Sequence, residues 1–340
     1  MSIKLSHSKA SRYQTCPKSY DFHYNKRIRS KYIGSPLFFG CAIDEALNCL
    51  LLTKKKVLTE DEKQLLLDFP TPDALFIHEM SNIEHNNVEV ALRDSLLTTY
   101  SKADLDLNGL SEDDIERLTE EFEGVTKIDE FAVFMQERLK SGEHISDDYL
   151  RYYSILCWEC LRAKGEAIIK TYEAEIMPLI EEVFTIQEKV HLPNEEGDEI
   201  IGYIDFTCKF FDDDNVYVGD NKTSATPYKP DRLTESEQLH TYAEYKELGH
   251  IAYIVMEKNI RKRDPKVRIN ILKGEINEET TEKTFDNLTD VLYGIREENF
   301  EPIDDMSVCR FQYGKRCIYY DLCHNDRLGD KVVVVPERVK

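Results

Sequence analysis

The sequence predicts an α/β protein: a mixed β-sheet flanked by helices, with a large helical insertion. Between residues 183 and 273 the apolar residues alternate with the period of strands. Residues 34–52 and 280–299, on either side, have the period of amphipathic helices. Residues 55–182 have mainly the helical period and interrupt this arrangement. We therefore divide the chain into an N-terminal part, an insertion, a core and a tail, at 1–54, 55–182, 183–300 and 301–340.

The composition is that of a globular protein. The chain has 340 residues, 41% of them hydrophobic, and no apolar run reaches the length of about 18 residues that a membrane span needs. The N-terminus has no apolar segment of the kind found in secretory signals. We expect a cytoplasmic protein of a bacterium or of a virus-infected host cell. In such a reducing compartment, the nine cysteines are better suited to binding metal than to disulfides.

The charge argues against a general nucleic-acid-binding surface but leaves room for a local one. The formal net charge is −21, and a polyanion is repelled by such an average field. Basic residues nevertheless gather in residues 1–33 and again in 258–268. The ordinary interpretation of each run is a solvated face.

A predicted β-hairpin holds the residues with the strongest chemical signal. Two β-runs, 200–211 and 216–221, are separated by a polar turn. Asp205 lies within the first run, and Asp220 and Lys222 lie at the end of the second. Since side chains alternate along a strand, Asp220 and Lys222 project from the same face, and the hairpin places Asp205 close to them.

Two carboxylates beside an ammonium are suited to hydrolysis of a phosphodiester. Mg²⁺ binds in proteins through one or two carboxylates, together with waters and substrate phosphate. Such a metal polarises the phosphoryl oxygen and lowers the pKa of a bound water. The alternative is that the two aspartates merely end strands and that the lysine is solvated. The order of these residues on a hairpin favours the site.

Gly202-x-x-Asp205 followed by Asp220-x-Lys222 resembles the core of the PD-(D/E)XK nuclease superfamily. More specifically it resembles the RecB-like exonuclease branch, which includes CRISPR-adaptation and phage exonucleases. The resemblance implies a restriction-endonuclease-like sheet. It also implies that Asp205 and Asp220 hold Mg²⁺ or Mn²⁺, with the carbonyl of Asn221 joining them, and that Lys222 positions the attacking water.

Two further motifs extend the resemblance. Gln238 and Tyr242 are four residues apart on one predicted helix, and in this branch the same pair orients substrate. Gly40-x-x-x-Asp44 stands where the family has Gly-x-x-x-His, so the resemblance makes Asp44 a metal ligand; an exposed helical carboxylate is the alternative. Glu188, on the strand before the hairpin, is a further candidate ligand.

Four cysteines resemble the ligands of the iron–sulfur members of this branch. Cys16 precedes a proline near the N-terminus, and Cys309, Cys317 and Cys323 lie near the C-terminus. The resemblance implies a [4Fe–4S] cluster that joins the two ends of the chain. The x₇ step after the first C-terminal cysteine departs from the x₂ step of the family. A structural Cys₄ zinc site and three unrelated cysteines remain alternatives, whereas the C-x-x-C at 157–160 reads as helical core.

The resemblance implies a metal-dependent DNA exonuclease directed at single strands or ends. Its place is recombination, repair or phage DNA metabolism, and a helicase or recombination protein is the expected partner. The alternative is a DNA-binding scaffold subunit of a helicase–nuclease-like complex that has kept the fold with little or no catalysis. An RNA substrate and a homo-oligomer are both compatible with the sequence.

Overall fold

The computed structural model describes most of the chain outside its middle. It covers residues 2–30, 32–81, 89–91, 137, 141, 162–224, 226–257, 267–303, 309, 317–325, 327–329 and 332–335. Much of the predicted insertion, including the C-x-x-C at 157–160, lies outside this part, as do the basic residues 258–266.

The centre of the molecule is a six-stranded mixed sheet, as predicted. Its strands are β1 Lys4–Leu5, β5 Ile180–Pro193, β6 Glu199–Phe210, β7 Val216–Ser224, β8 His250–Glu257 and β9 Arg268–Glu275. The order is β1-β6-β7-β8-β9, with β5 paired to β6. The β5–β6, β6–β7 and β8–β9 pairs are antiparallel, and the β1–β6 and β7–β8 pairs are parallel.

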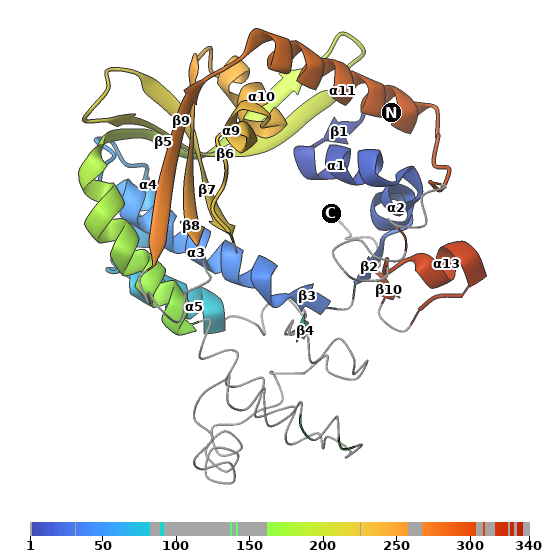
Figure 1. The fold of residues 1–340 in the computed structure, drawn as a ribbon, viewed down its shortest axis with the longest axis horizontal. Helices are drawn as coiled ribbons and strands as arrows, with labels where there is room; N and C mark the ends of the chain where they lie inside the picture. The colour runs from blue at the N-terminus through green and yellow to red at the C-terminus, as the bar shows by residue number, and fades with distance from the viewer. Residues whose placement is uncertain are drawn as a thin grey trace.

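Helices cover both faces of the sheet (Figure 1). On one face α3, Ser35–Leu52, shares a buried cluster with Ala252 and Ile254 of β8. On the other face α10, Glu237–Tyr245, packs against Ile251 and Val255 of the same strand. Alternate residues of one strand thus pack on opposite helical layers, because side chains of a strand alternate between the two faces.

Short elements complete the described part. Helices α1 His7–Thr15 and α2 Pro17–Tyr20 follow β1, and α11 Glu278–Arg296 packs against α1 and α10. The others are a π-helical turn at Asp21–Asn25, β2 Ile28–Ser30, β3 Tyr32–Gly34, α4 Glu60–Asp68, α5 Pro72–Ser81, β4 Glu89–Ala91, helical residues 162–170, a π-helical turn at Tyr172–Ile176, a 3₁₀ turn at Met177–Leu179, α9 Asp231–Thr234, α13 Tyr320–Asn325 and β10 Val332–Val334. None of the described helices is long and apolar enough to cross a membrane.

The two ends of α10 are set by its capping residues. Ser236 is the N-cap, and its hydroxyl accepts a hydrogen bond from the backbone N–H of Leu239 at 3.3 Å. The C-terminal end of the helix does not depend on Gly249. The left-handed residue is Glu247, with φ of 55°, and the N–H of Leu248 donates to the carbonyl of Ala243 at 2.9 Å. This contact closes the helix two residues before Gly249.

The hairpin of β6 and β7 is paired along only part of its length. Its register runs from Lys209↔Val216 to Phe206↔Gly219 and stops there. Beyond Phe206, β6 leaves β7, and its first two residues pair with β1 instead. Gly219 permits the last pair, because a Cβ at this position would lie 2.1 Å from the ring of Phe206. The sheet therefore opens next to Asp205.

The two ends of the chain are packed together (Figure 1). Strand β10 pairs antiparallel with β2, and Phe22, Ile28 and Tyr319 share a buried cluster. The hydroxyl of Tyr319 donates to the carbonyl of Ile28 at 3.0 Å and lies 2.8 Å from Nδ1 of His23. Residues nearly 300 positions apart are thus parts of one small core.

Candidate active site

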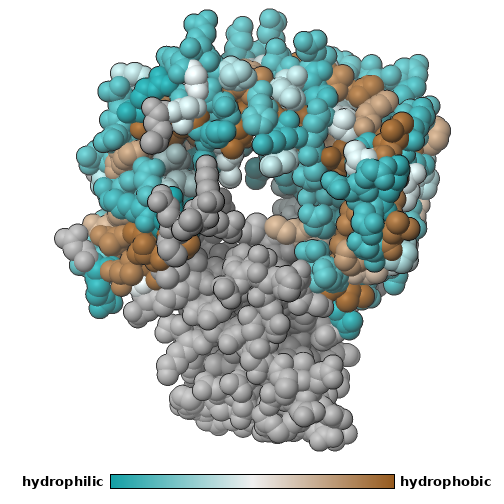
Figure 2. All heavy atoms as spheres, turned by 180° about the vertical axis from the view of Figure 1, so that it is seen from behind, coloured by the Kyte–Doolittle hydropathy of each residue, from teal (hydrophilic) through white to brown (hydrophobic). Residues whose placement is uncertain are grey.

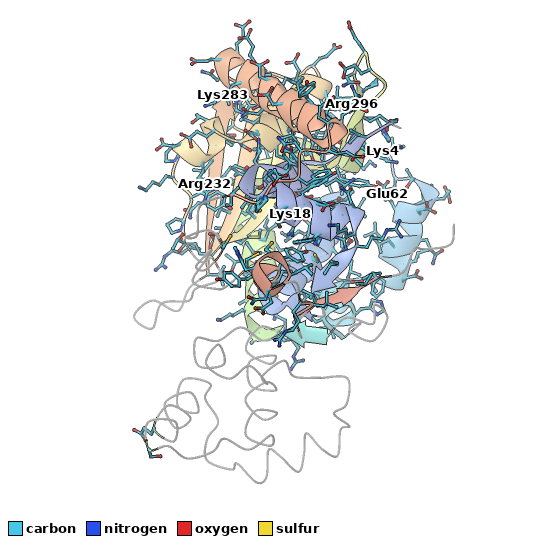
Figure 3. The ribbon with its side chains drawn as sticks, turned by 90° about the vertical axis from the view of Figure 1, so that its right-hand side faces the viewer. Lys4, Lys18, Glu62, Arg232, Lys283 and Arg296 are labelled. Atoms are coloured by element: carbon cyan, nitrogen blue, oxygen red, sulfur yellow. The ribbon has the colours of Figure 1, made fainter. Side chains whose placement is uncertain are left out.

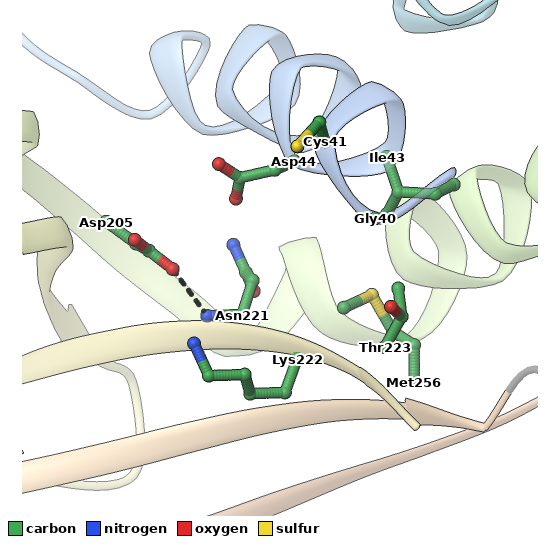
Figure 4. A pocket seen from close by; sticks show the side chains of 9 residues that line it. All are labelled: Gly40, Cys41, Ile43, Asp44, Asp205, Asn221, Lys222, Thr223 and Met256. Atoms are coloured by element: carbon green, nitrogen blue, oxygen red, sulfur yellow. Dashed lines mark hydrogen bonds between the residues drawn. The ribbon is translucent and has the colours of Figure 1, made fainter. Parts of the chain in front are cut away.

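Asp205 lies where β6 and β7 separate. Its Oδ2 accepts a hydrogen bond from the backbone N–H of Asn221 at 3.0 Å (Figure 4). The side chain thereby occupies a donor that the strand pairing has left free, since the β6–β7 ladder ends at Phe206↔Gly219. This contact fixes the carboxylate against β7, immediately between Asp220 and Lys222 in the sequence.

Asp220 and Lys222 point to the same side of β7 and form an ion pair. Nζ of Lys222 lies 2.5 Å from Oδ2 of Asp220, whose side chain is only 3% exposed. Burial by itself lowers the pKa of Lys222, but Asp220 and then Asp205 outweigh burial and raise it above its ordinary value. The ammonium therefore stays charged at neutral pH.

Asp44 brings a third carboxylate from α3. Its Oδ2 accepts a hydrogen bond from Nε2 of Gln187 at 3.2 Å, while Oδ1 is buried without a hydrogen-bond partner among the described residues. Burial, followed by the charges of Glu45 and Asp220, raises the pKa of Asp44 to about 6. The carboxylate is half-buried in the site, not exposed on a free helix face.

Asp44 and Asp205 line one hollow, and the charge of Asp220 acts on both of them. A cavity of about 310 Å³ is lined by Gly40, Cys41, Ile43, Asp44, Asp205, Asn221, Lys222, Thr223 and Met256 (Figure 4). Burial, and then the charges of Asp220 and Asp44, raise the pKa of Asp205 well above its ordinary value. Three like charges with one ammonium leave an excess of negative charge in a small volume, which a cation offsets.

The donor set fits a hard divalent cation. Among the described residues no three His, Cys, Asp or Glu side chains form a complete ligand group. Mg²⁺ does not require one, because it usually takes one or two carboxylates and completes its shell with waters and phosphate oxygens. The unpartnered Oδ1 of Asp44 and the second carboxylate oxygen of Asp205 supply such ligands. Asn221 lines the same cavity, with its side-chain Oδ1 accepting from the Tyr172 hydroxyl at 3.3 Å.

Gln187 is a site residue that sequence reasoning missed. It lies in β5 between the pairs Ile186↔Phe206 and Glu188↔Ile204, which places it opposite Asp205. Its φ is +50°, a left-handed conformation that is costly for a residue with a Cβ. Such strain in the middle of a strand is typical of functional sites. No local signal marks Gln187, because a glutamine in an alternating strand is unremarkable in sequence.

Glu188, the further candidate ligand, is engaged by a lysine. Its carboxylate is paired with Nζ of Lys246 of α10, at 2.8 and 2.9 Å. This ion pair joins β5 to α10.

Gln238 and Tyr242 meet on the face of α10 that is turned to the hairpin. Nε2 of Gln238 lies 3.5 Å from the hydroxyl of Tyr242. The tyrosine ring packs over Gly202, where an added Cβ would lie 2.2 Å from the hydroxyl. Burial raises the pKa of Tyr242, although the hydrogen bond from Gln238 lowers it. The charges of Asp220 and Asp205 raise this pKa further. His7 covers the same ring in an edge-on contact, with centroids 5.6 Å apart.

The four cysteines gather where the two chain ends meet. Cys16 is the junction of α1 and α2, and the backbone N–H of Cys317 donates to the carbonyl of Cys309 at 2.8 Å. Burial, and then the thiols of Cys317, Cys16 and Cys309, raise the pKa of Cys323 to about 11. All four are free thiols in one region, without forming a complete metal-ligand group within the part of the chain that is described.

An opened hairpin with clustered carboxylates and a charged, half-buried lysine is suited to phosphodiester hydrolysis. A family model described as the PD-(D/E)XK nuclease superfamily matches residues 4–324. The chain belongs to this superfamily, whose members are nucleases that typically use Mg²⁺ or Mn²⁺.

Two other comparisons add little. One solved structure, titled "Crystal structure of SSO0001", is similar over 58% of this chain and 84% of that chain, at 13% identity and a TM-score of 0.26. No curated protein matches the chain.

Proposed function

We propose that the protein is a Mg²⁺- or Mn²⁺-dependent DNA exonuclease of the RecB-like branch, directed at single strands or ends. The observation that carries this proposal is the contact of Asp205 with the Asn221 N–H, because it unites Asp205 with the Asp220–Lys222 pair at the opening of the sheet. Recombination, repair or phage DNA metabolism is the setting we propose, with a helicase or recombination protein as partner.

Each residue has a role that follows from its contacts. Asp44, Asp205 and Asp220, with the carbonyl of Asn221, are the groups that hold the metal. When bound, the metal supplies a polarised phosphoryl oxygen and a water of lowered pKa. Lys222 stays protonated, so it serves as an electrostatic donor to the developing phosphoryl charge and orients the attacking water.

Gln238 and Tyr242 support the exonuclease proposal as substrate-orienting residues. Their contact with each other and the packing of Tyr242 over Gly202 fix them beside the hairpin. Rigid placement of a donor next to the reacting phosphate lowers the entropic part of the barrier. The RecB-like motif order, together with this placement, is the basis for preferring end-directed cleavage.

We also propose that Cys16, Cys309, Cys317 and Cys323 bind a [4Fe–4S] cluster as a structural clasp, with zinc as the alternative. Thiolates are ligands for both centres. The support is their gathering at the joined chain ends, where Cys317 and Cys323 pack against the buried cluster of Phe22, Ile28, Tyr319 and Val332.

Cleavage of end-labelled DNA by the parent protein and by Lys222→Ala tests the nuclease proposal. In Mn²⁺ we expect the variant to lose about 10²–10³-fold in rate, the effect of removing one donor to a developing oxyanion. Lys283→Ala, an exposed lysine on α11, is the control and should retain the parental rate.

The form of the nucleic-acid substrate then distinguishes an exonuclease from an endonuclease, a ribonuclease or a scaffold subunit. Degradation of linear single strands with circles left intact supports an exonuclease, whereas cleavage of circles or of RNA contradicts that assignment. Equal rates for the parent and Lys222→Ala would contradict the site. DNA binding without cleavage by the parent would point to the scaffold subunit.

A further inference from the structure

Positive charge is concentrated in the first thirty residues of an otherwise acidic chain. The net charge is −21, yet residues 2–30 contain only one acidic residue, Asp21. The basic residues of this segment are Lys4, Lys9, Arg12, Lys18, Lys26, Arg27 and Arg29. Lys4 and Lys18 lie on the flank of the molecule that Figure 3 faces.

Three of these cations have no carboxylate partner among the described residues, and we call Lys9, Arg12 and Arg29 the basic cluster. Nζ of Lys9 donates to the carbonyl of Lys4 at 2.6 Å, and Nη1 of Arg12 donates to the Ser19 hydroxyl at 3.3 Å. Nη1 of Arg29 is buried without a hydrogen-bond partner in the described part. By contrast, Lys4, Lys18 and Lys26 pair with Glu199 or Asp21 at 3.0 to 4.0 Å.

Two residues of the basic cluster, Lys9 and Arg29, lie over one aromatic ring. Nζ of Lys9 lies 5.5 Å and Cζ of Arg29 lies 5.2 Å from the ring centroid of Tyr24. Burial, and then the charge of Arg29, lower the pKa of Lys9. Burial, and then Arg12 and Arg29, lower the pKa of His23 to about 3. Cations close enough to repel one another, with no anion between them, are stabilised by an anionic ligand.

The basic cluster lies close to the candidate active site. Helix α1 begins at His7, whose ring contacts Tyr242 of α10. Lys9 and Arg12 follow on the same helix, within about 8 Å of His7 along its axis at 1.5 Å per residue. Helices α1 and α2 lie across the centre of the molecule from α3 and β7 (Figure 1). Figure 2 shows an opening at this centre, and much of its coloured rim is hydrophilic.

We propose that Lys9, Arg12 and Arg29 bind phosphates of the nucleic-acid strand beyond the bond that is cut. This proposal rests on the proposed function. It adds a second contact between the protein and the strand, one that does not depend on the base sequence. Arginine binds phosphate through two parallel N–H donors, and backbone contacts position a strand without reading its bases. A local basic surface also attracts a polyanion to a protein whose remaining surface repels it.

A metal–thiolate centre is the other anion near this surface, but it does not account for the whole cluster. Arg12 lowers the pKa of the Cys317 thiol, and Lys18 lowers that of Cys323, in each case against a larger effect of burial. Lys9 and Arg29 lie at Tyr24 instead. These two residues therefore provide the cleanest test of phosphate binding.

The test measures binding of a labelled single-stranded oligonucleotide, in EDTA, as a function of salt. The variant Lys9→Gln/Arg29→Gln removes two of the proposed contacts. We expect its affinity to fall about tenfold or more, and the slope of log K against log salt to fall in magnitude by about 1.4, at about 0.7 per phosphate contact.

The control is Lys283→Gln/Arg232→Gln. It removes the same charge elsewhere, and Arg232 lies over the ring of Tyr228 at 5.4 Å much as Arg29 lies over Tyr24. The control should bind with parental affinity and slope. Hydrolysis of bis(p-nitrophenyl) phosphate, which has a single phosphodiester, should be the same in the parent and in Lys9→Gln/Arg29→Gln.

The outcomes separate this proposal from the proposed function. Parental affinity and slope in Lys9→Gln/Arg29→Gln, or an equal loss in the control, would overturn the phosphate-binding surface while cleavage by the parent leaves the nuclease standing. A parent that binds through these residues without cutting would overturn the nuclease alone. Lack of oligonucleotide binding by the parent would overturn the surface. Unchanged iron and zinc content in the variant shows that its loss of binding does not come from the cysteines.

Discussion

Gln187 carries a conformational cost at the position where its side chain meets the active site. A left-handed backbone costs a residue with a Cβ about 1–2 kcal/mol. In return, the amide donates to Oδ2 of Asp44 at 3.2 Å, while Oδ1 stays buried without a hydrogen-bond partner among the described residues. A residue that orients a metal ligand in this way typically affects metal affinity or activity by about 10–100-fold. We therefore interpret Gln187 as a positioning residue for Asp44.

Two substitutions at this position separate strain from function. Gln187→Ala and Gln187→Gly both remove the amide, so each should raise the Mn²⁺ concentration needed for half-maximal cleavage by about tenfold. Only glycine relieves the backbone, so Gln187→Gly should be more stable than Gln187→Ala by about 1 kcal/mol in urea unfolding. Parental Mn²⁺ dependence in both variants would show that the amide does not orient Asp44.

Helix α1 connects the N-terminus to the active-site tyrosine through its first residue. His7 packs against Tyr242, and its Nε2 is buried without a hydrogen-bond partner among the described residues. Burial lowers the pKa of His7 to about 4 from its ordinary 6.5. Its place at the N-terminus of a helix also opposes a positive charge. The neutral ring is therefore the form that holds α1 against α10.

This burial makes part of the stability pH-dependent. Because the pKa of His7 is lower in the folded state, the unfolded state binds the proton first as pH falls. The stability that the neutral His7 ring contributes is fully present above pH 6.5 and is lost as the pH falls from 6.5 to 4. From pH 7 to 5 we expect the free energy of unfolding to fall by about 1–2 kcal/mol more in the parent than in His7→Phe. Parallel pH profiles in urea unfolding would contradict this account, and His7→Gln provides a polar control.

The molecule as a whole depends on the joining of its two ends. Strands β2 and β10, the ring of Tyr319 and the four cysteines bring residues of the first thirty and the last thirty-two positions into one unit. Closing a loop of this length is entropically costly. A metal held by the four cysteines would offset this cost, because binding free energy that only the folded chain gains adds to the free energy of folding.

Metal content gives the matching prediction. Protein purified without oxygen should contain iron and absorb broadly near about 400 nm if the thiols bind an iron–sulfur cluster. Cys16→Ser should lose most of the iron and unfold at a lower temperature, whereas Cys41→Ser, a cysteine outside the group, should retain both. Zinc in place of iron would identify a zinc clasp, and neither metal in the parent would overturn both.

The apolar period of the sequence by itself determined where the strands lie and which side chains of each strand point to the same face. The predicted run 200–211 is β6 at Glu199–Phe210, and the ion pair of Asp220 with Lys222 follows from alternation alone. Alternation and helical period are local properties, set by backbone geometry over a few residues.

Only the tertiary structure decided which distant groups meet. The register of β5 turns Gln187 toward Asp44 and Glu188 toward Lys246, and a shift of one residue would exchange them. Because the β6–β7 ladder ends at Phe206↔Gly219, the backbone N–H of Asn221 is free to donate to Asp205. These contacts depend on pairing between segments far apart in the chain. The sequence of one segment does not indicate which other segment it pairs with, or in which register.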